Sequence, residues 1–166
     1  MTQTNLSRFT NPYLASETDV LGITAQIQRL ETDDQLAALW YIYTELGRVI
    51  APAAFEIAKF HLAERLLNQV RNASGEEQLE IMRDLANHRD TQAGRTYGAL
   101  NVKTKLAFWY QLAEWMTQEI VVPMPSDYSM TPEANQTLEA LKRLALNQQT
   151  IVLRNVVAKM GIDPLA

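Results

Sequence analysis

Two histidines, His61 and His88, are the side chains of this sequence best suited to metal or acid–base chemistry. A di-iron carboxylate site in a helical bundle would need a glutamate three residues before each histidine, but Ala58 and Leu85 stand there. His61 alone could ligate a haem iron, although a single helical histidine is more often a surface or capping residue. The absence of cysteine excludes thiolate nucleophiles, iron–sulfur clusters and cysteine-bound zinc. We therefore predict no catalytic residue, no metal site and no enzyme.

Tryptophan and tyrosine occur in pairs within two apolar segments, "DDQLAALWYIYTELG" and "KLAFWYQLAEWM". Trp40 and Tyr43 are three residues apart and share one face of a helix, whereas Trp109 and Tyr110 are adjacent. Such rings commonly pack a core, where each buries about 150–250 Å². Their N–H and O–H groups need hydrogen-bond partners, however, so a core that needs only volume is better served by leucine and phenylalanine. Core packing and the lining of a cavity for a large apolar guest both fit this spacing.

Methionines from four separate segments lie near apolar helix faces or in a proline-rich stretch: Met82, Met116, Met124 and Met160. A flexible thioether either fills gaps in a core or lets a cavity adapt to its guest.

Arg154 interrupts the apolar run "TIVLRNVVAKMG". Its side chain could extend to solvent along the helix or make a polar contact with a protein partner.

Apolar residues recur at spacings of three and four, and only six glycines and six prolines interrupt the pattern, so we predict an all-α fold. The predicted helices span residues 17–30, 33–50, 53–70, 75–86, 94–100, 102–120, 132–144 and 147–160. Ser74 is expected to cap one helix, and Thr32 or Asp33 another, where Asp33 and Asp34 would also favour the helix dipole. Gly161 is expected to end the last helix in a left-handed conformation.

The length of 166 residues fits a single domain over residues 1–166, with an N-terminal arm at 1–17 and a proline-rich connector at 121–132. A net charge of −4 and a pI near 5.2 argue against nucleic acid as a partner. No stretch approaches the roughly 20 apolar residues of a transmembrane helix, and no apolar leader is present. We expect a soluble intracellular protein that is a monomer or a weak dimer.

Five blocks in this order resemble the N-terminal domain of the cyanobacterial orange carotenoid protein and its single-domain relatives, the helical carotenoid proteins. The blocks are "DDQLAALWYIYTELG", "DLANHRDTQAGRTYGAL", "KLAFWYQLAEWM", "VVPMPSDY" and "QQTIVLRNVVAKMG". The resemblance runs from Asp19 to Asp163. It implies two interleaved four-helix bundles with a keto-carotenoid, namely canthaxanthin, echinenone or 3′-hydroxyechinenone, in a tunnel between them.

The resemblance also implies which side chains line or closely flank that tunnel. These predicted carotenoid-binding residues are Leu36, Trp40, Tyr43, Met82, Leu106, Trp109, Tyr110, Ala113, Met116, Met124, Tyr128, Val157 and Met160. The phenols of Tyr43, Tyr110 and Tyr128 are the only ionisable groups that we assign to the lining, and we expect each to keep the ordinary pKa of about 10.

The function implied by the resemblance is photoprotection by a carotenoid that quenches singlet oxygen physically, without bond chemistry. Two alternatives remain open. The protein could dock on the phycobilisome through Arg154 and quench excitation energy there, or it could deliver carotenoid to a partner that resembles the C-terminal domain. The implied location is the cyanobacterial cytoplasm, with association to phycobilisomes on the thylakoid surface under the docking alternative.

Overall fold

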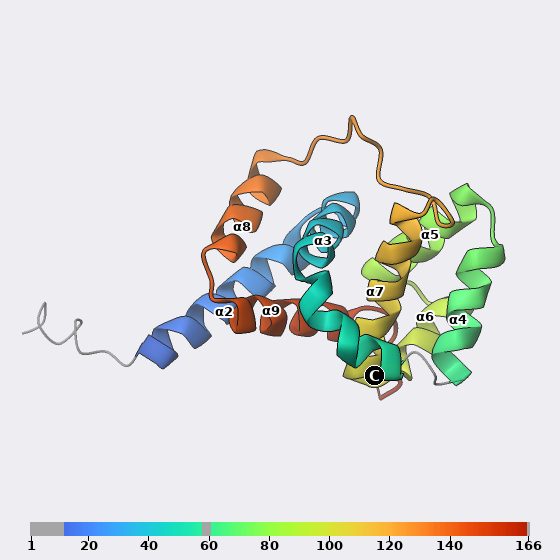
Figure 1. Ribbon diagram of the computed structural model, residues 1–166, viewed down its shortest axis with the longest axis horizontal. Coiled ribbons are helices and arrows are strands. Elements are labelled where there is room, and N and C mark those ends of the chain that lie inside the picture. Colours follow the sequence, from blue (N-terminus) through green and yellow to red (C-terminus); the bar gives the residue numbers. More distant parts are fainter. Residues whose placement is uncertain (1–11, 58–60, 166) are drawn as a thin grey trace, which may run out of the picture.

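The computed structural model describes the backbone of residues 12–57 and 61–165, and the side chains of residues 17–46 and 63–165 (Figure 1). Eight α-helices and no strand occur in the described residues, which confirms the all-α prediction. The helices are α2 (Pro12–Arg29), α3 (Thr32–Ile57), α4 (His61–Asn72), α5 (Gly75–Ala86), α6 (Gln92–Gly98), α7 (Val102–Thr117), α8 (Pro132–Lys142) and α9 (Leu146–Lys159).

Local chemistry explains most helix boundaries. The predicted cap at Ser74 is confirmed, because its hydroxyl accepts a hydrogen bond from the Glu77 amide at 3.3 Å. Thr91, Asn101 and Thr131 cap α6, α7 and α8 in the same way. Helix α2 begins at Pro12 rather than at residue 17. Proline is favoured in the first turn of a helix, because amides there have no acceptor within the helix and the missing N–H of proline therefore breaks no hydrogen bond.

Helix α3 differs most from the sequence prediction. A break was expected between residues 50 and 53, around Pro52, but the backbone remains helical to Ile57. A proline inside a helix removes one hydrogen bond and bends the axis without always ending the helix. The breaking signal of this one proline therefore does not end the helix. His61 begins α4, and its side chain lies outside the described residues.

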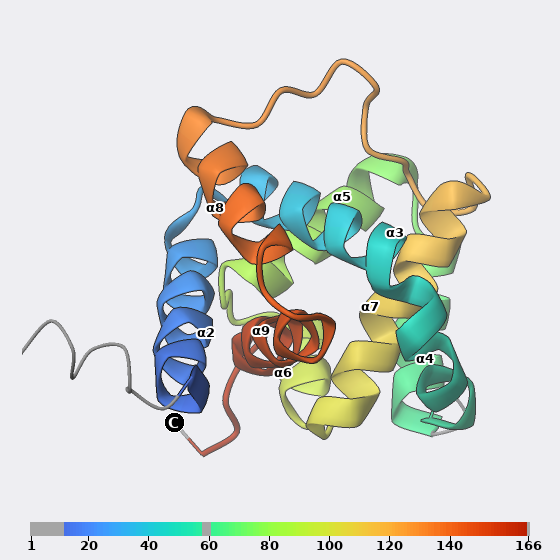
Figure 2. The same cartoon turned by 60° about the vertical axis from the view of Figure 1, so that its left-hand side comes forward.

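Helix α3 lies between two groups of helices (Figure 1). Helices α2, α8 and α9 pack together on one side, and α4, α5, α6 and α7 pack together on the other. Contacts of α7 with both α3 and α9 join the two groups. Residues 118–131 carry no helix and arch from α7 over to α8, as Figure 2 also shows. Within the described residues, no helix has both the length and the apolar character needed to cross a membrane.

The segment after α9 is held between α5 and α6 by backbone hydrogen bonds. The Gly161 amide donates to the Leu85 carbonyl at 2.9 Å, and the Ile162 amide donates to the Gly94 carbonyl at 3.0 Å. Gly161 has φ +73°, which confirms the left-handed conformation expected from the sequence. The backbone of Ile162 lies so close to α6 that a Cβ added at Gly98 would be 1.6 Å from the Ile162 carbonyl oxygen.

We predict that Gly98→Ala lowers the free energy of unfolding by about 1–3 kcal/mol or more, because rigid backbone must move to admit the methyl group. Gly22→Ala is the matched control: Gly22 lies in α2 with nothing within 4 Å of the added Cβ, so helix propensity should raise stability by about 0.5–1 kcal/mol. Chemical denaturation of both variants measures the difference. Equal stability of Gly98→Ala and the wild type would contradict this account of the tail.

Candidate functional site

A cavity of about 170 Å³ lies between α3, α5, α7 and the non-helical segment 118–131. We call this space the central cavity. Its walls are mainly apolar side chains, aromatic rings and thioethers. The lining residues are Asp33, Leu36, Ala37, Leu39, Trp40, Tyr43, Leu79, Met82, Arg83, Trp109, Leu112, Ala113, Met116, Val122, Pro123, Met124, Pro125 and Tyr128.

Trp109 on α7 forms part of the wall, and a relay of hydrogen bonds holds it from the side of the core. Its Nε1–H donates to the Tyr97 hydroxyl at 3.0 Å, and that hydroxyl donates to the Val157 carbonyl of α9. The rings of Tyr97, Phe108 and Trp109 also meet edge to face, with centroids 5.5–6.5 Å apart. The polar hydrogen of the indole is therefore used inside the core, and Trp109 offers the cavity only apolar surface.

Tyr43 on α3 is buried in the same wall. Its hydroxyl donates to the Leu106 carbonyl of α7 at 2.8 Å, so this hydrogen is also used within the protein. Burial, with a smaller contribution from Tyr97, raises the pKa of Tyr43 well above the ordinary value for a phenol. Tyr43 therefore stays neutral at physiological pH, as the sequence predicted, but its pKa is not the ordinary one.

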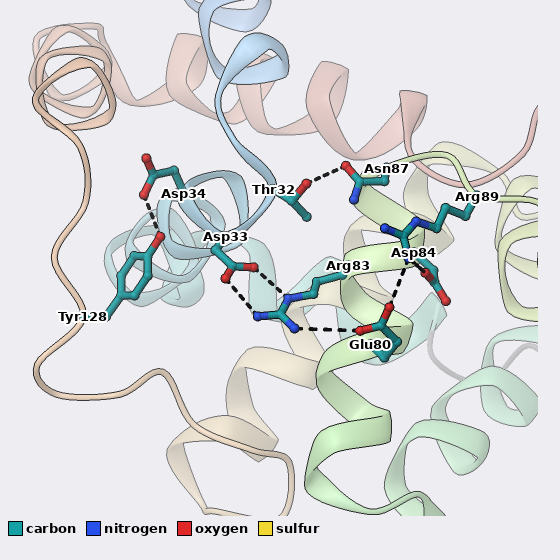
Figure 3. Close-up of polar contacts among 9 residues, drawn as sticks. All are labelled: Thr32, Asp33, Asp34, Glu80, Arg83, Asp84, Asn87, Arg89 and Tyr128. Atoms are coloured by element: carbon teal, nitrogen blue, oxygen red, sulfur yellow. Dashed lines mark hydrogen bonds and ion pairs between the residues drawn. The ribbon is translucent and has the colours of Figure 1, made fainter.

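The non-helical segment 118–131 supplies the remaining wall. Its anchor is Asp34, a buried carboxylate that accepts hydrogen bonds from the Tyr128 hydroxyl at 2.7 Å and the Thr131 hydroxyl at 2.8 Å (Figure 3 shows Tyr128). At the other end, the Val122 amide donates to the Gln78 side chain at 2.8 Å. The expectation that Asp34 serves the start of its helix is therefore incomplete, because its side chain ties the segment to α3. Burial and the adjacent Asp34 raise the pKa of Tyr128.

Asp33 and Arg83 are the two charged side chains among the lining residues, and we call them the rim pair. The Arg83 Nε and Nη2 groups donate to the two oxygens of Asp33 at 2.8 and 2.9 Å (Figure 3). The guanidinium holds the pKa of Asp33 below its usual value, and the carboxylate raises the pKa of Arg83. Both side chains are partly exposed, at 36% for Arg83 and 44% for Asp33. The rim pair therefore lies where the cavity approaches solvent.

The rim pair corrects two predictions. Asp33 does not act as a cap, because its carboxylate binds Arg83, and the Thr32 hydroxyl donates to the Asn87 side chain (Figure 3). The expectation that phenols are the only ionisable groups of the lining is wrong for this cavity, since Asp33 and Arg83 also line it. Tyr110 is not among the lining residues, and burial, with Glu114, raises its pKa.

Nine of the residues predicted from the resemblance line the central cavity: Leu36, Trp40, Tyr43, Met82, Trp109, Ala113, Met116, Met124 and Tyr128. Four do not. Leu106 and Tyr110 are half-buried on α7, and the Tyr110 ring centroid lies 6.5 Å from that of Tyr43. Val157 and Met160 are buried in the core. The structure thus gathers nine predicted residues around one space, and a carotenoid contact at each position stays a prediction.

The remaining lining residues were missed: Asp33, Ala37, Leu39, Leu79, Arg83, Leu112, Val122, Pro123 and Pro125. Helical spacing could have found Leu79 and Leu112, which lie three residues before Met82 and three residues after Trp109. No local pattern places the charged Arg83 beside an apolar cavity, because its partner Asp33 is 50 residues away.

Neither His88 nor Arg154 lines the central cavity. The described residues contain no group of three or more histidine, cysteine, aspartate or glutamate side chains arranged to hold a metal ion. His88 instead lies after α5, with its Nδ1 3.1 Å from the Gly161 carbonyl oxygen. Arg154 is exposed on α9, away from the central cavity.

Comparison with known proteins gives concordant matches. A family model described as orange carotenoid protein, N-terminal, matches residues 14–163. An orange carotenoid-binding domain-containing protein of Nostoc sp. strain PCC 7120 is 52% identical over 161 residues, which cover 96% of this chain and 94% of that protein.

Solved structures agree with the sequence comparison. The orange carotenoid protein of Anabaena (Nostoc) sp. PCC 7120 binding canthaxanthin superposes with a TM-score of 0.80 at 43% identity. That match covers 87% of this chain and 47% of the solved one, so this chain spans about half of that protein. The red carotenoid protein of the same organism binding canthaxanthin has a TM-score of 0.73 at 36% identity, and the match covers 86% of this chain and 98% of that one.

We predict that Asp34→Ala loosens segment 118–131, because the hydroxyls of Tyr128 and Thr131 lose their acceptor. The free energy of unfolding should fall by about 1–3 kcal/mol, and limited proteolysis within the segment should become faster. Asp127→Ala is the matched control, since Asp127 is an exposed carboxylate of the same segment. Unchanged proteolysis of Asp34→Ala would show that Asp34 does not anchor this wall.

Proposed function

The chain belongs to the family of orange carotenoid protein N-terminal domains, and from this premise we propose that it binds a keto-carotenoid and quenches singlet oxygen physically. The family binds carotenoids and is not an enzyme family. The observation that carries the proposal is the central cavity, with walls of aromatic, thioether and aliphatic side chains. When bound, a carotenoid supplies the photophysics, since its polyene takes up excitation and releases it as heat.

The side chains of the cavity suit the terminal part of such a pigment. Large aromatic and thioether groups give dispersion contacts with a flat conjugated chain, and the small Ala113 leaves room beside them. The volume of about 170 Å³ is below the roughly 300–1,000 Å³ of typical small-molecule sites, so the cavity suits one end of the ligand and not all of it. Canthaxanthin is our first candidate because two solved relatives bind it.

The rest of the polyene would run beyond the central cavity. Leu106, Tyr110, Val157 and Met160 remain the proposed contacts there. Because Val157 and Met160 are buried in the core, contact with pigment requires side chains that now cover them to move aside. A rearrangement on loading is therefore part of the proposal.

Colour tests the proposal directly. The protein purified from a host that makes keto-carotenoids should be orange to red, and Trp40→Ser should lose most of its pigment, because removing a large wall residue costs about 3–5 kcal/mol. The phenols of the cavity stay neutral, so absorption should not change between about pH 5 and about pH 9.

Trp115→Ser is the matched control for this experiment. Trp115 packs on the core with Arg71 over its ring, and it does not line the central cavity, so the same truncation should leave the pigment-to-protein ratio near that of the wild type. A colourless wild-type protein would refute carotenoid binding. Equal pigment in Trp40→Ser and the wild type would refute the wall assignment alone.

Arg154 supports a second function, docking on the phycobilisome as an energy quencher. The side chain is exposed on α9, one turn after Ile151, an apolar residue that is 46% exposed. We predict that the pigmented protein lowers phycobilisome fluorescence and that Arg154→Glu abolishes the effect without changing pigment content, which fluorescence titration measures. Unchanged emission with the wild type would leave photoprotection by singlet-oxygen quenching, or delivery of carotenoid to a C-terminal-domain-like partner, as the proposed roles.

The proposed location is the cytoplasm of a cyanobacterium, because the relatives come from cyanobacteria.

A further inference from the structure

We propose that Arg83 binds the ligand directly, by donating a hydrogen bond to a carbonyl oxygen on its terminal ring. The inference rests on the proposed carotenoid binding, and it identifies the ring carbonyl as the feature of the ligand that the cavity selects. It assigns to the rim pair a preference for rings that carry an oxo group over rings that are purely hydrocarbon.

The hydrogen-bond donors of the central cavity, taken one by one, favour Arg83 as the donor to the ring carbonyl. The Tyr43 hydroxyl donates to a backbone carbonyl, the Tyr128 hydroxyl donates to Asp34, and the Trp109 indole donates to Tyr97. A ring carbonyl can only accept hydrogen bonds, so these three groups have nothing left to offer it. The other N–H donors among the lining side chains are the indole of Trp40 and the guanidinium of Arg83, and only the guanidinium is charged.

Arg83 retains donors after its ion pairs are made. A guanidinium carries five N–H groups. Its Nε and Nη2 each donate to one oxygen of Asp33, and its Nη1 lies 3.8 Å from the nearest Glu80 oxygen, beyond hydrogen-bond distance. Even with one Nη1 hydrogen directed at Glu80, the other Nη1 hydrogen and the second Nη2 hydrogen are available. A charged donor to a carbonyl makes one of the stronger hydrogen bonds in proteins.

The neighbours of Arg83 hold it at the rim and keep it charged. Asp33 binds it through two parallel hydrogen bonds, and Glu80 adds a second negative charge (Figure 3). A guanidinium fixed in this way loses little further side-chain freedom when a ligand arrives. A hydrocarbon ring in the same place would cover these N–H groups without giving them an acceptor, and this desolvation is unfavourable.

Arg89 provides a matched comparison within the same ion-pair network. Its Nη1 lies 3.1 Å from Glu80 and 3.2 Å from Asp84 (Figure 3), but it does not line the central cavity. Replacing either arginine by methionine removes two ion pairs between partly exposed side chains, which costs little stability. Only the Arg83 replacement removes a donor from the cavity.

The test is a competition between canthaxanthin, which carries a carbonyl on each ring, and β-carotene, which carries none. The full-length apoprotein is loaded from an equimolar mixture, and the bound pigments are extracted and quantified. The wild type and Arg89→Met should enrich canthaxanthin about tenfold or more, as one charge-assisted hydrogen bond allows. Arg83→Met should bind both pigments within about threefold of each other, and Arg83→Lys should recover part of the preference. Melting temperatures of the apoproteins show whether each variant is folded.

A second measurement reports the contact itself. The carbonyl stretch of bound canthaxanthin in a vibrational spectrum should lie at lower frequency in the wild type and in Arg89→Met than in Arg83→Met. The inference is overturned if Arg83→Met keeps the enrichment of the wild type, or if the carbonyl frequency is the same in both. Failure of the wild type to bind either pigment would refute the proposed function instead, so the two failures are distinguishable.

Discussion

The requirement that buried polar hydrogens find acceptors shapes this protein more than any other single constraint. The Tyr97 hydroxyl meets that requirement at the junction of α6, α7 and α9, where it accepts from Trp109 and donates to the Val157 carbonyl. Among the described residues, no fully buried side-chain nitrogen or oxygen lacks a partner. Because the core takes up these polar groups, large amphipathic rings can form an almost entirely apolar wall on their other side.

The need to pair hydrogen-bond donors with acceptors also determines how charged side chains are arranged around the central cavity. Asp34 and Asp33 are adjacent in the sequence, yet one anchors segment 118–131 and the other binds Arg83 of α5. Two neighbouring carboxylates thus connect α3 to two of the three other elements around the central cavity, α5 and segment 118–131. The first turn of α3 consequently fixes the positions of walls that are distant from it along the chain.

Helical spacing was enough to predict the fold class, most helices and the cap at Ser74, because these depend on residues a few positions apart. The break expected near Pro52 was wrong, because a proline inside a helix can bend it without ending it. Spacing alone left the role of the aromatic residues open, and the resemblance to a known family supplied nine residues that line the cavity. The rim pair was not predictable, because two residues 50 positions apart show no mutual pattern in one sequence.

Three sides of the central cavity are helices, whereas segment 118–131 forms the fourth and carries no helix. Stiff helices and a non-helical segment that is more easily displaced therefore enclose the same space. Outward movement of the non-helical side breaks the hydrogen bonds of Asp34 and Gln78 and uncovers apolar side chains such as Val122, while the helical sides keep their backbone hydrogen bonds. A change in the width of this space therefore falls mainly on one side, and the aromatic walls on α3 and α7 keep their places.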